Sequence, residues 1–118
     1  MTNLEKVKEV IFAVKTVELE DYVAEDCIVE QQGDDFVVYT KFDAIEGGDE
    51  VLRVNFYKFA FEIKAWAQNV HNIVIESYVS FDDDGYAIVT TVNGTKPIVA
   101  DTEVEAIIKA GVWVLKHI

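Results

Sequence analysis

The stretch SFDDDGYAIVTT, residues 80–91, places three consecutive aspartates directly before a glycine. This arrangement is similar to the start of an EF-hand calcium loop, in which oxygen ligands precede a glycine at position six. Such a loop also needs a bidentate glutamate at position twelve and a helix after it. With Gly85 at position six, position twelve is Thr91, and the residues after Gly85 are strand-forming. The sequence therefore argues against an EF-hand and predicts a hairpin with Asp84-Gly85 in a type I′ turn.

The other side chains that could support catalysis or metal binding are few. His71, His117 and Cys27 are the only histidines and cysteine, and their spacing matches no zinc site. The chain has no P-loop, dinucleotide-binding, serine-hydrolase or C-x-x-C motif. Carboxylates are so numerous that no acid–base pair can be singled out. We therefore expect a protein that is not an enzyme and that has no cofactor and no metal site.

Acidic residues dominate the charge of the chain. The sequence has 22 Asp and Glu against 10 Lys and Arg, a net charge of −12, and residues 18–35 contain eight acids and no base. Such a chain repels phosphates and anionic membranes, so we expect no direct nucleic-acid or membrane partner and favour a basic protein partner. The alternative is that the acids only keep a small protein in solution. The predicted partner-binding residues are Glu18, Glu20, Asp21, Glu25, Asp26, Asp34, Asp35, Asp82 and Asp83.

The length and composition of the chain fit one domain over residues 1–118. No apolar run is long enough to cross a membrane, and the charged start of the chain lacks the apolar core of a signal peptide. A lone cysteine excludes an intrachain disulfide and fits a reducing compartment. We therefore expect a cytoplasmic protein.

Local patterns indicate a mixture of helices and strands. Thr2 and Glu5 form a capping box ahead of a helix at about residues 3–16. Residues 17–26 fit either a helix or a strand. The runs 27–32 and 36–42 are rich in β-branched and aromatic residues, and a Gly-Asp-Asp turn joins them as a hairpin.

Residues 50–70 carry two overlapping patterns. An apolar stripe at helical spacing runs from Leu52 to Val70, yet residues 50–55 alternate like a strand. We expect a third strand over residues 50–55, with Asn55 capping a helix that continues to about Val70.

The last third of the chain predicts a hairpin followed by a helix. Residues 72–81 and 85–92 have strand composition, Phe81 and Tyr86 flank their turn, and residues 93–97 read as a loop. Thr102 and Glu105 form a second capping box before the final helix. The predicted fold is an α+β sandwich, with an antiparallel sheet of four to five strands and three helices, in the rough order α-β-β-β-α-β-β-α.

Two resemblances follow from these patterns. Residues 82–115 resemble the hairpin–helix end of small phage-encoded sandwich proteins, on Ala100, Thr102, Glu105, Ala106 and Ile107. The same stretch is similar to part of an antitoxin type with a DGY strand and a T-x-x-E-A helix, although its proline-glycine-cysteine turn is absent. The order of elements resembles the secretion-chaperone fold, an acidic homodimer that holds a partner chain in extended form.

Two functions are compatible with the sequence. The first is an acidic inhibitor or immunity-type protein, encoded by a phage or another mobile element, that occludes a basic site on a protein partner. The alternative is a dimeric, secretion-chaperone-like adaptor that binds a partner chain through an apolar groove. In that case exposed aromatic residues such as Tyr57, Phe61 or Trp113 would bind the partner.

Overall fold

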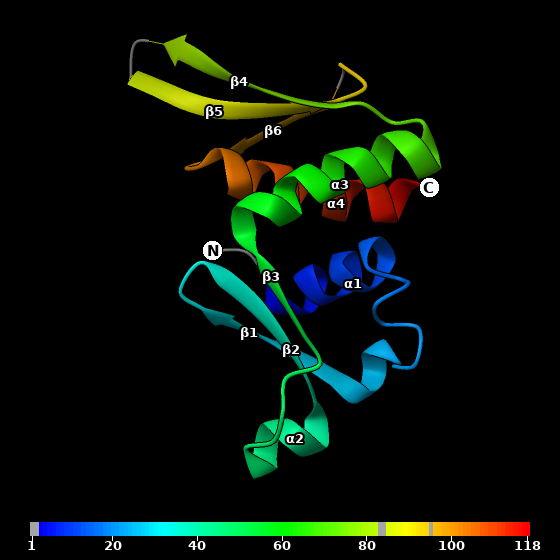
Figure 1. Ribbon diagram of the computed structural model, residues 1–118. Helices are drawn as coiled ribbons and strands as arrows, with labels where there is room; N and C mark the ends of the chain where they lie inside the picture. Colours follow the sequence, from blue (N-terminus) through cyan, green and yellow to red (C-terminus); the bar gives the residue numbers. More distant parts are fainter. Residues whose placement is uncertain (1–2, 83–84, 95) are drawn as a thin grey trace. The chain divides into compact units, whose positions relative to one another are not determined.

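The computed structural model describes residues 3–82, 85–94 and 96–118 (Figure 1). Over these residues the chain is an α+β protein with four α-helices, one short 3-10 helix and two antiparallel sheets of three strands each. The chain divides into two compact units, residues 1–59 and residues 60–118. None of the described helices is long and apolar enough to cross a membrane.

The first unit contains one helix packed on a three-stranded sheet of order β1-β2-β3. Val7, Val10 and Ile11 on α1 are fully buried, and α1 packs against β1. The helix begins after Asn3, whose Oδ1 accepts a hydrogen bond from the Glu5 amide at 2.9 Å, so the cap lies one residue later than the capping-box pattern indicates. The elements are α1 (Leu4–Val14), η1 (Ala24–Asp26), β1 (Cys27–Gln32), β2 (Asp35–Thr40), α2 (Lys41–Glu46) and β3 (Leu52–Asn55).

The predicted first hairpin is confirmed, but its second strand ends earlier than expected. β1 and β2 pair from Cys27 opposite Thr40 to Gln32 opposite Asp35, with Gly33 in the turn at φ +60°. Residues 41 and 42 do not continue the strand, because Thr40 caps the short helix α2. Its Oγ1 accepts a hydrogen bond from the Asp43 amide at 3.0 Å.

The strand pattern and the helix pattern in residues 50–70 are both realised in the structure, first the strand and then the helix. β3 ends at Asn55, and α3 (Phe56–His71) begins at the next residue without a loop. Asn55 is the cap that the sequence predicts, because its Oδ1 accepts hydrogen bonds from the amides of Tyr57 (3.0 Å) and Lys58 (3.4 Å).

The second unit has its own sheet, of order β4-β5-β6, on which α4 packs. Its strands and final helix are β4 (Ile75–Asp82), β5 (Gly85–Val92), β6 (Lys96–Ala100) and α4 (Glu103–His117). The predicted pairing of Phe81 with Tyr86 is confirmed. The prediction that Gly85 is a central residue of a type I′ turn is wrong, because Gly85 is the first residue of β5 and pairs with Asp82, while Asp84 lies outside the described residues. Thr102 caps α4 as predicted, with Oγ1 accepting from the Glu105 amide at 3.2 Å.

The prediction of one sheet with four to five strands and three helices is therefore wrong in detail. Residues 96 and 97, which the sequence predicts as the end of a loop, are instead the first two residues of the strand β6. A proline is tolerated there because β6 lies at the edge of its sheet, where one side of the strand donates no ladder hydrogen bonds. The six described strands also form two separate sheets.

Candidate partner-binding surface

The structure separates the acidic run of residues 18–35 into two groups. Asp34 lies in the turn after β1, and Asp35 is the first residue of β2. The other predicted acids of this run lie at the opposite end of β1, because they precede it in the chain. A strand rises about 3.3 Å per residue, so the six residues of β1 separate the two groups by roughly 20 Å. The group before β1 consists of Glu18, Glu20, Asp21, Glu25 and Asp26, and all five residues are exposed.

The segment before β1 is held to the first unit by one apolar side chain. Leu19 is 2% exposed, and the backbone around it turns through hydrogen bonds from the Leu19 amide to the Lys15 carbonyl and from the Tyr22 amide to the Leu19 carbonyl, both 3.0 Å. Because Leu19 points inward, its acidic neighbours Glu18 and Glu20 point into solvent. In the described part of the chain, no lysine or arginine forms an ion pair with any of the five carboxylates of this segment.

The hairpin register brings a second acidic segment to the same end of the sheet. Cys27 pairs with Thr40, so η1, directly before Cys27, and α2, directly after Thr40, leave the sheet at the same end (Figure 1). We call residues 17–26 and 41–49 the acidic end. It contains eight acids and one base, Lys41.

Asp82 and Asp83 belong to the second unit. Asp82 is the last residue of β4, and its side chain is outside the description, as is the whole of Asp83. Their participation in a partner-binding surface remains a prediction.

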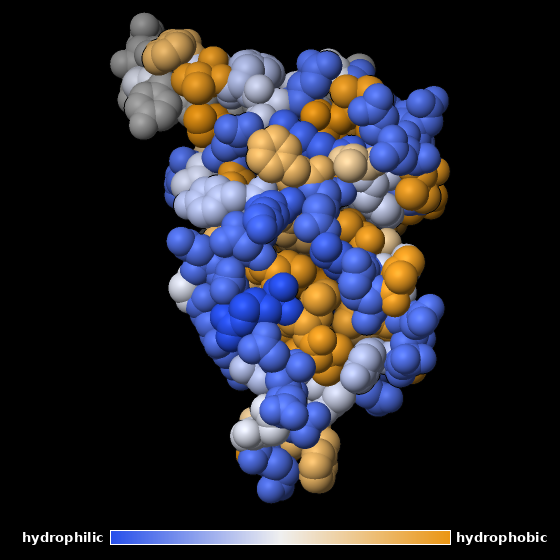
Figure 2. Space-filling model, viewed as in Figure 1, coloured by the Kyte–Doolittle hydropathy of each residue, from blue (hydrophilic) through white to orange (hydrophobic). Residues whose placement is uncertain are grey.

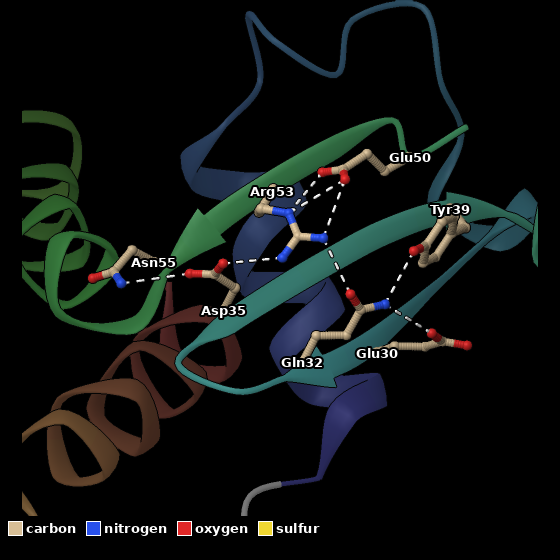
Figure 3. Close-up of polar contacts among 7 residues, drawn as sticks. All are labelled: Glu30, Gln32, Asp35, Tyr39, Glu50, Arg53 and Asn55. Carbon is tan, nitrogen blue, oxygen red and sulfur yellow. Dashed lines mark hydrogen bonds and ion pairs between the residues drawn. The ribbon is translucent and has the colours of Figure 1, made fainter. Parts of the chain in front are cut away.

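A polar network covers the face of the first sheet that is turned away from α1 (Figure 3). Its centre is Arg53 on β3, which donates to Glu50 Oε2 from Nε at 3.0 Å, to Asp35 Oδ2 from Nη1 at 3.0 Å and to Gln32 Oε1 from Nη2 at 3.1 Å. Asn55 Nδ2 adds a bond of 3.4 Å to Asp35 Oδ1. Sequence reasoning missed this network because Arg53 lies 18 and 21 positions from Asp35 and Gln32, and meets them only through the strand register.

The network extends to the first strand and raises the pKa of its arginine. Gln32 Nε2 donates to Tyr39 Oη at 3.0 Å and to Glu30 Oε2 at 3.3 Å. The hydrogen bonds that Arg53 donates to Glu50 and, second, to Asp35 raise the pKa of its guanidinium above the ordinary value. Arg53 is therefore paired with two carboxylates, and one of them belongs to the predicted partner-binding residue Asp35.

Cys27 on β1 is fully buried, and α1 packs against this strand. Lys8 Nζ donates to its carbonyl oxygen at 3.0 Å and also pairs with Glu5 at 3.2 Å. Burial raises the pKa of the Cys27 thiol. The thiol is therefore protonated near neutral pH and is a poor nucleophile and metal ligand.

The two histidines lie against tryptophans on their own helices. The His71 ring meets Trp66 edge-on at 4.9 Å, and the His117 ring stacks on Trp113 at 4.0 Å. His117 Nδ1 also lies 2.7 Å from the Trp113 carbonyl oxygen. Among the described residues, no group of three His, Cys, Asp or Glu side chains is placed to hold a metal ion.

One further polar cluster lies in the second unit. Ser77 Oγ on β4 donates to Glu103 Oε1 at 2.6 Å, and Lys64 Nζ on α3 is 3.4 Å from Ser77 Oγ. Glu103 is in the first turn of α4, where a negative charge is favoured by the helix dipole. The cluster joins α3, β4 and the start of α4, and we interpret it as a contact that stabilises the second unit.

No protein-family model, no curated protein and no solved structure matches the chain.

Proposed function

We propose that the protein is a non-enzymatic acidic binding protein of the inhibitor or immunity type, of the kind that phages and other mobile elements encode. Its acidic end would cover a basic site on a protein partner and block that site by occlusion. The observation that carries this proposal is that the five acidic residues of the segment 18–26 are exposed and that their carboxylates lack a lysine or arginine partner in the described part of the chain.

The charge balance within the first unit supports this choice of surface. Residues 1–59 contain 14 acids and six bases, against eight acids and four bases in residues 60–118. Arg53 pairs with carboxylates on the face of the first sheet that is turned away from α1, and Lys8 pairs with Glu5 on α1. Among the described residues of the first unit, most exposed carboxylates without a lysine or arginine partner therefore lie at the acidic end, where they would steer a basic partner and accelerate its association.

The experiment is a capture from lysate of the source cells or of their host, followed by binding kinetics with the partner it identifies. Tagged wild type, Glu20→Lys/Asp21→Lys and Glu76→Lys/Asp101→Lys are compared. The last variant reverses the same amount of charge at exposed residues of the second unit. We expect one basic partner, whose association rate falls about tenfold for the first variant only and falls with added salt for wild type. Equal effects of both variants, or binding insensitive to salt, would contradict the proposal.

The second candidate is the dimeric chaperone-like adaptor, and one observation favours it. Tyr57 and Phe61 are 58% and 74% exposed, as that hypothesis expects of residues that bind an apolar partner chain. Trp113 is only half-exposed and is stacked on His117, so it is less available for this role. Sedimentation at several concentrations would distinguish the candidates, because the adaptor requires a stable homodimer.

A further inference from the structure

The helix α2 exposes two large apolar side chains. Phe42 is 72% and Ile45 is 83% exposed, and they are three residues apart, which places them on the same side of the helix. None of the residues of α2 is buried. A helix of six residues is too short to be stable by itself, so its geometry depends on its ends.

Those ends are closed by local hydrogen bonds. Thr40 and Asp43 bond to each other in both directions at 3.0 Å, and Gly47 closes the helix in the left-handed conformation at φ +72°. The Gly48 amide donates to the Asp43 carbonyl at 2.8 Å. The fold therefore fixes the backbone of α2 without using Phe42 or Ile45, and the exposure of these two residues has no structural explanation within the first unit.

Acidic residues flank the apolar pair in the chain, with Asp43 and Glu46 on α2 itself and Asp49 shortly after it. The acidic end has one base among eight acids, and Val17 and Val23 on its other segment are also exposed, at 76% and 55%. Figure 2 shows apolar surface bordered by hydrophilic surface where Figure 1 places α2. An apolar centre with a charged rim is the usual arrangement of a protein interface.

We infer that Phe42 and Ile45 are the apolar anchors with which the acidic end docks onto its partner, and that the docked segment of the partner carries apolar side chains flanked by lysine or arginine. This inference rests on the proposed function. In it, Phe42 and Ile45 provide the affinity for the partner, and the carboxylates of the acidic end accelerate its association. Charge complementarity selects this partner over a second copy of the chain, because two acidic ends would repel each other.

The test uses the full chain and a displayed library of random 16-residue peptides as the probe. Selection against wild type is followed by synthesis of the enriched peptides and measurement of Kd by fluorescence polarisation. The test variant is Phe42→Ser/Ile45→Ser. The matched control is Tyr78→Ser/Val70→Ser, which also removes an aromatic and an aliphatic side chain, here 52% and 65% exposed in the second unit. Since the replaced residues in both variants are exposed, circular dichroism and urea unfolding should match wild type.

We expect enriched peptides that combine basic and apolar residues, and a Kd that rises at least about 30-fold for the α2 variant and less than about threefold for the control. Basic peptides that bind wild type and the α2 variant equally would overturn the inference and leave the proposed function standing. Failure to enrich basic peptides would count against both. Self-association of wild type that the α2 variant abolishes would also overturn the inference, because the occupant would then be a second copy.

Discussion

The sharpest test of the local structure is the substitution Thr40→Ala at the start of α2. This change removes the Thr40 hydroxyl, which accepts a hydrogen bond from the Asp43 amide and donates one to the Asp43 carboxylate, each at 3.0 Å. Loss of an N-cap threonine costs about 1 kcal/mol. None of the residues of α2 is buried, so most of this cost should appear as local opening of α2.

A loss of about 1 kcal/mol corresponds to a roughly fivefold larger population of the opened helix. The assay is amide hydrogen exchange, which we expect to accelerate about fivefold at Asp43 and at Gly48, whose amide bonds to the Asp43 carbonyl. Amides of β1 and β2 should be unaffected. Thr40→Ser keeps the hydroxyl and serves as the control. Equal acceleration in the serine and alanine variants would refute the assignment of the hydroxyl as the cap.

Three further predictions follow from the described contacts. Asn55→Ala should lower the free energy of unfolding by about 1 kcal/mol and speed exchange at Tyr57 and Lys58, whereas Asn55→Ser should retain most of the cap; equal losses in urea unfolding would contradict this. Burial raises the pKa of the Cys27 thiol above its ordinary value of 9.0, so the unfolded chain loses this proton at a lower pH than the folded chain does. The free energy of unfolding should therefore fall as the pH rises through about 9, and Cys27→Ala should remove this pH dependence. Thr90 is fully buried, and its Oγ1 has no hydrogen-bond partner among the described residues, so Thr90→Val should raise the free energy of unfolding by roughly 1 kcal/mol, and a lower midpoint in urea would count against this reasoning.

The sequence was most informative where one residue determines the local structure. Asn55 can cap a helix and end a strand, so the overlapping patterns around it could be resolved in advance, and Thr102 with Glu105 similarly marks the start of α4. Composition was misleading at α2 and β6. Thr40 and Phe42 are typical of strands, and Gly94 and Pro97 are typical of loops, yet a side-chain cap and an edge position decided the outcome.

The candidate surface was predictable only in part. The unpaired charge of residues 18–26 follows from a run of acids without a base, and the structure leaves these side chains exposed. The separation of Asp34 and Asp35 from that group, and the contact of Asp35 with Arg53, depend on strand register. Register is set by pairing between distant segments, which a single sequence without aligned relatives does not reveal.

The construction of α2 also bears on how the binding specificity could evolve. Thr40, Asp43 and Gly47 hold the helix through its ends, while Phe42 and Ile45 have most of their surface in solvent. Substitutions at the two exposed positions would therefore change the surface offered to a partner at little cost to folding. A lineage that must follow a changing target could explore new side chains at these positions one mutation at a time, without compensating changes in the core.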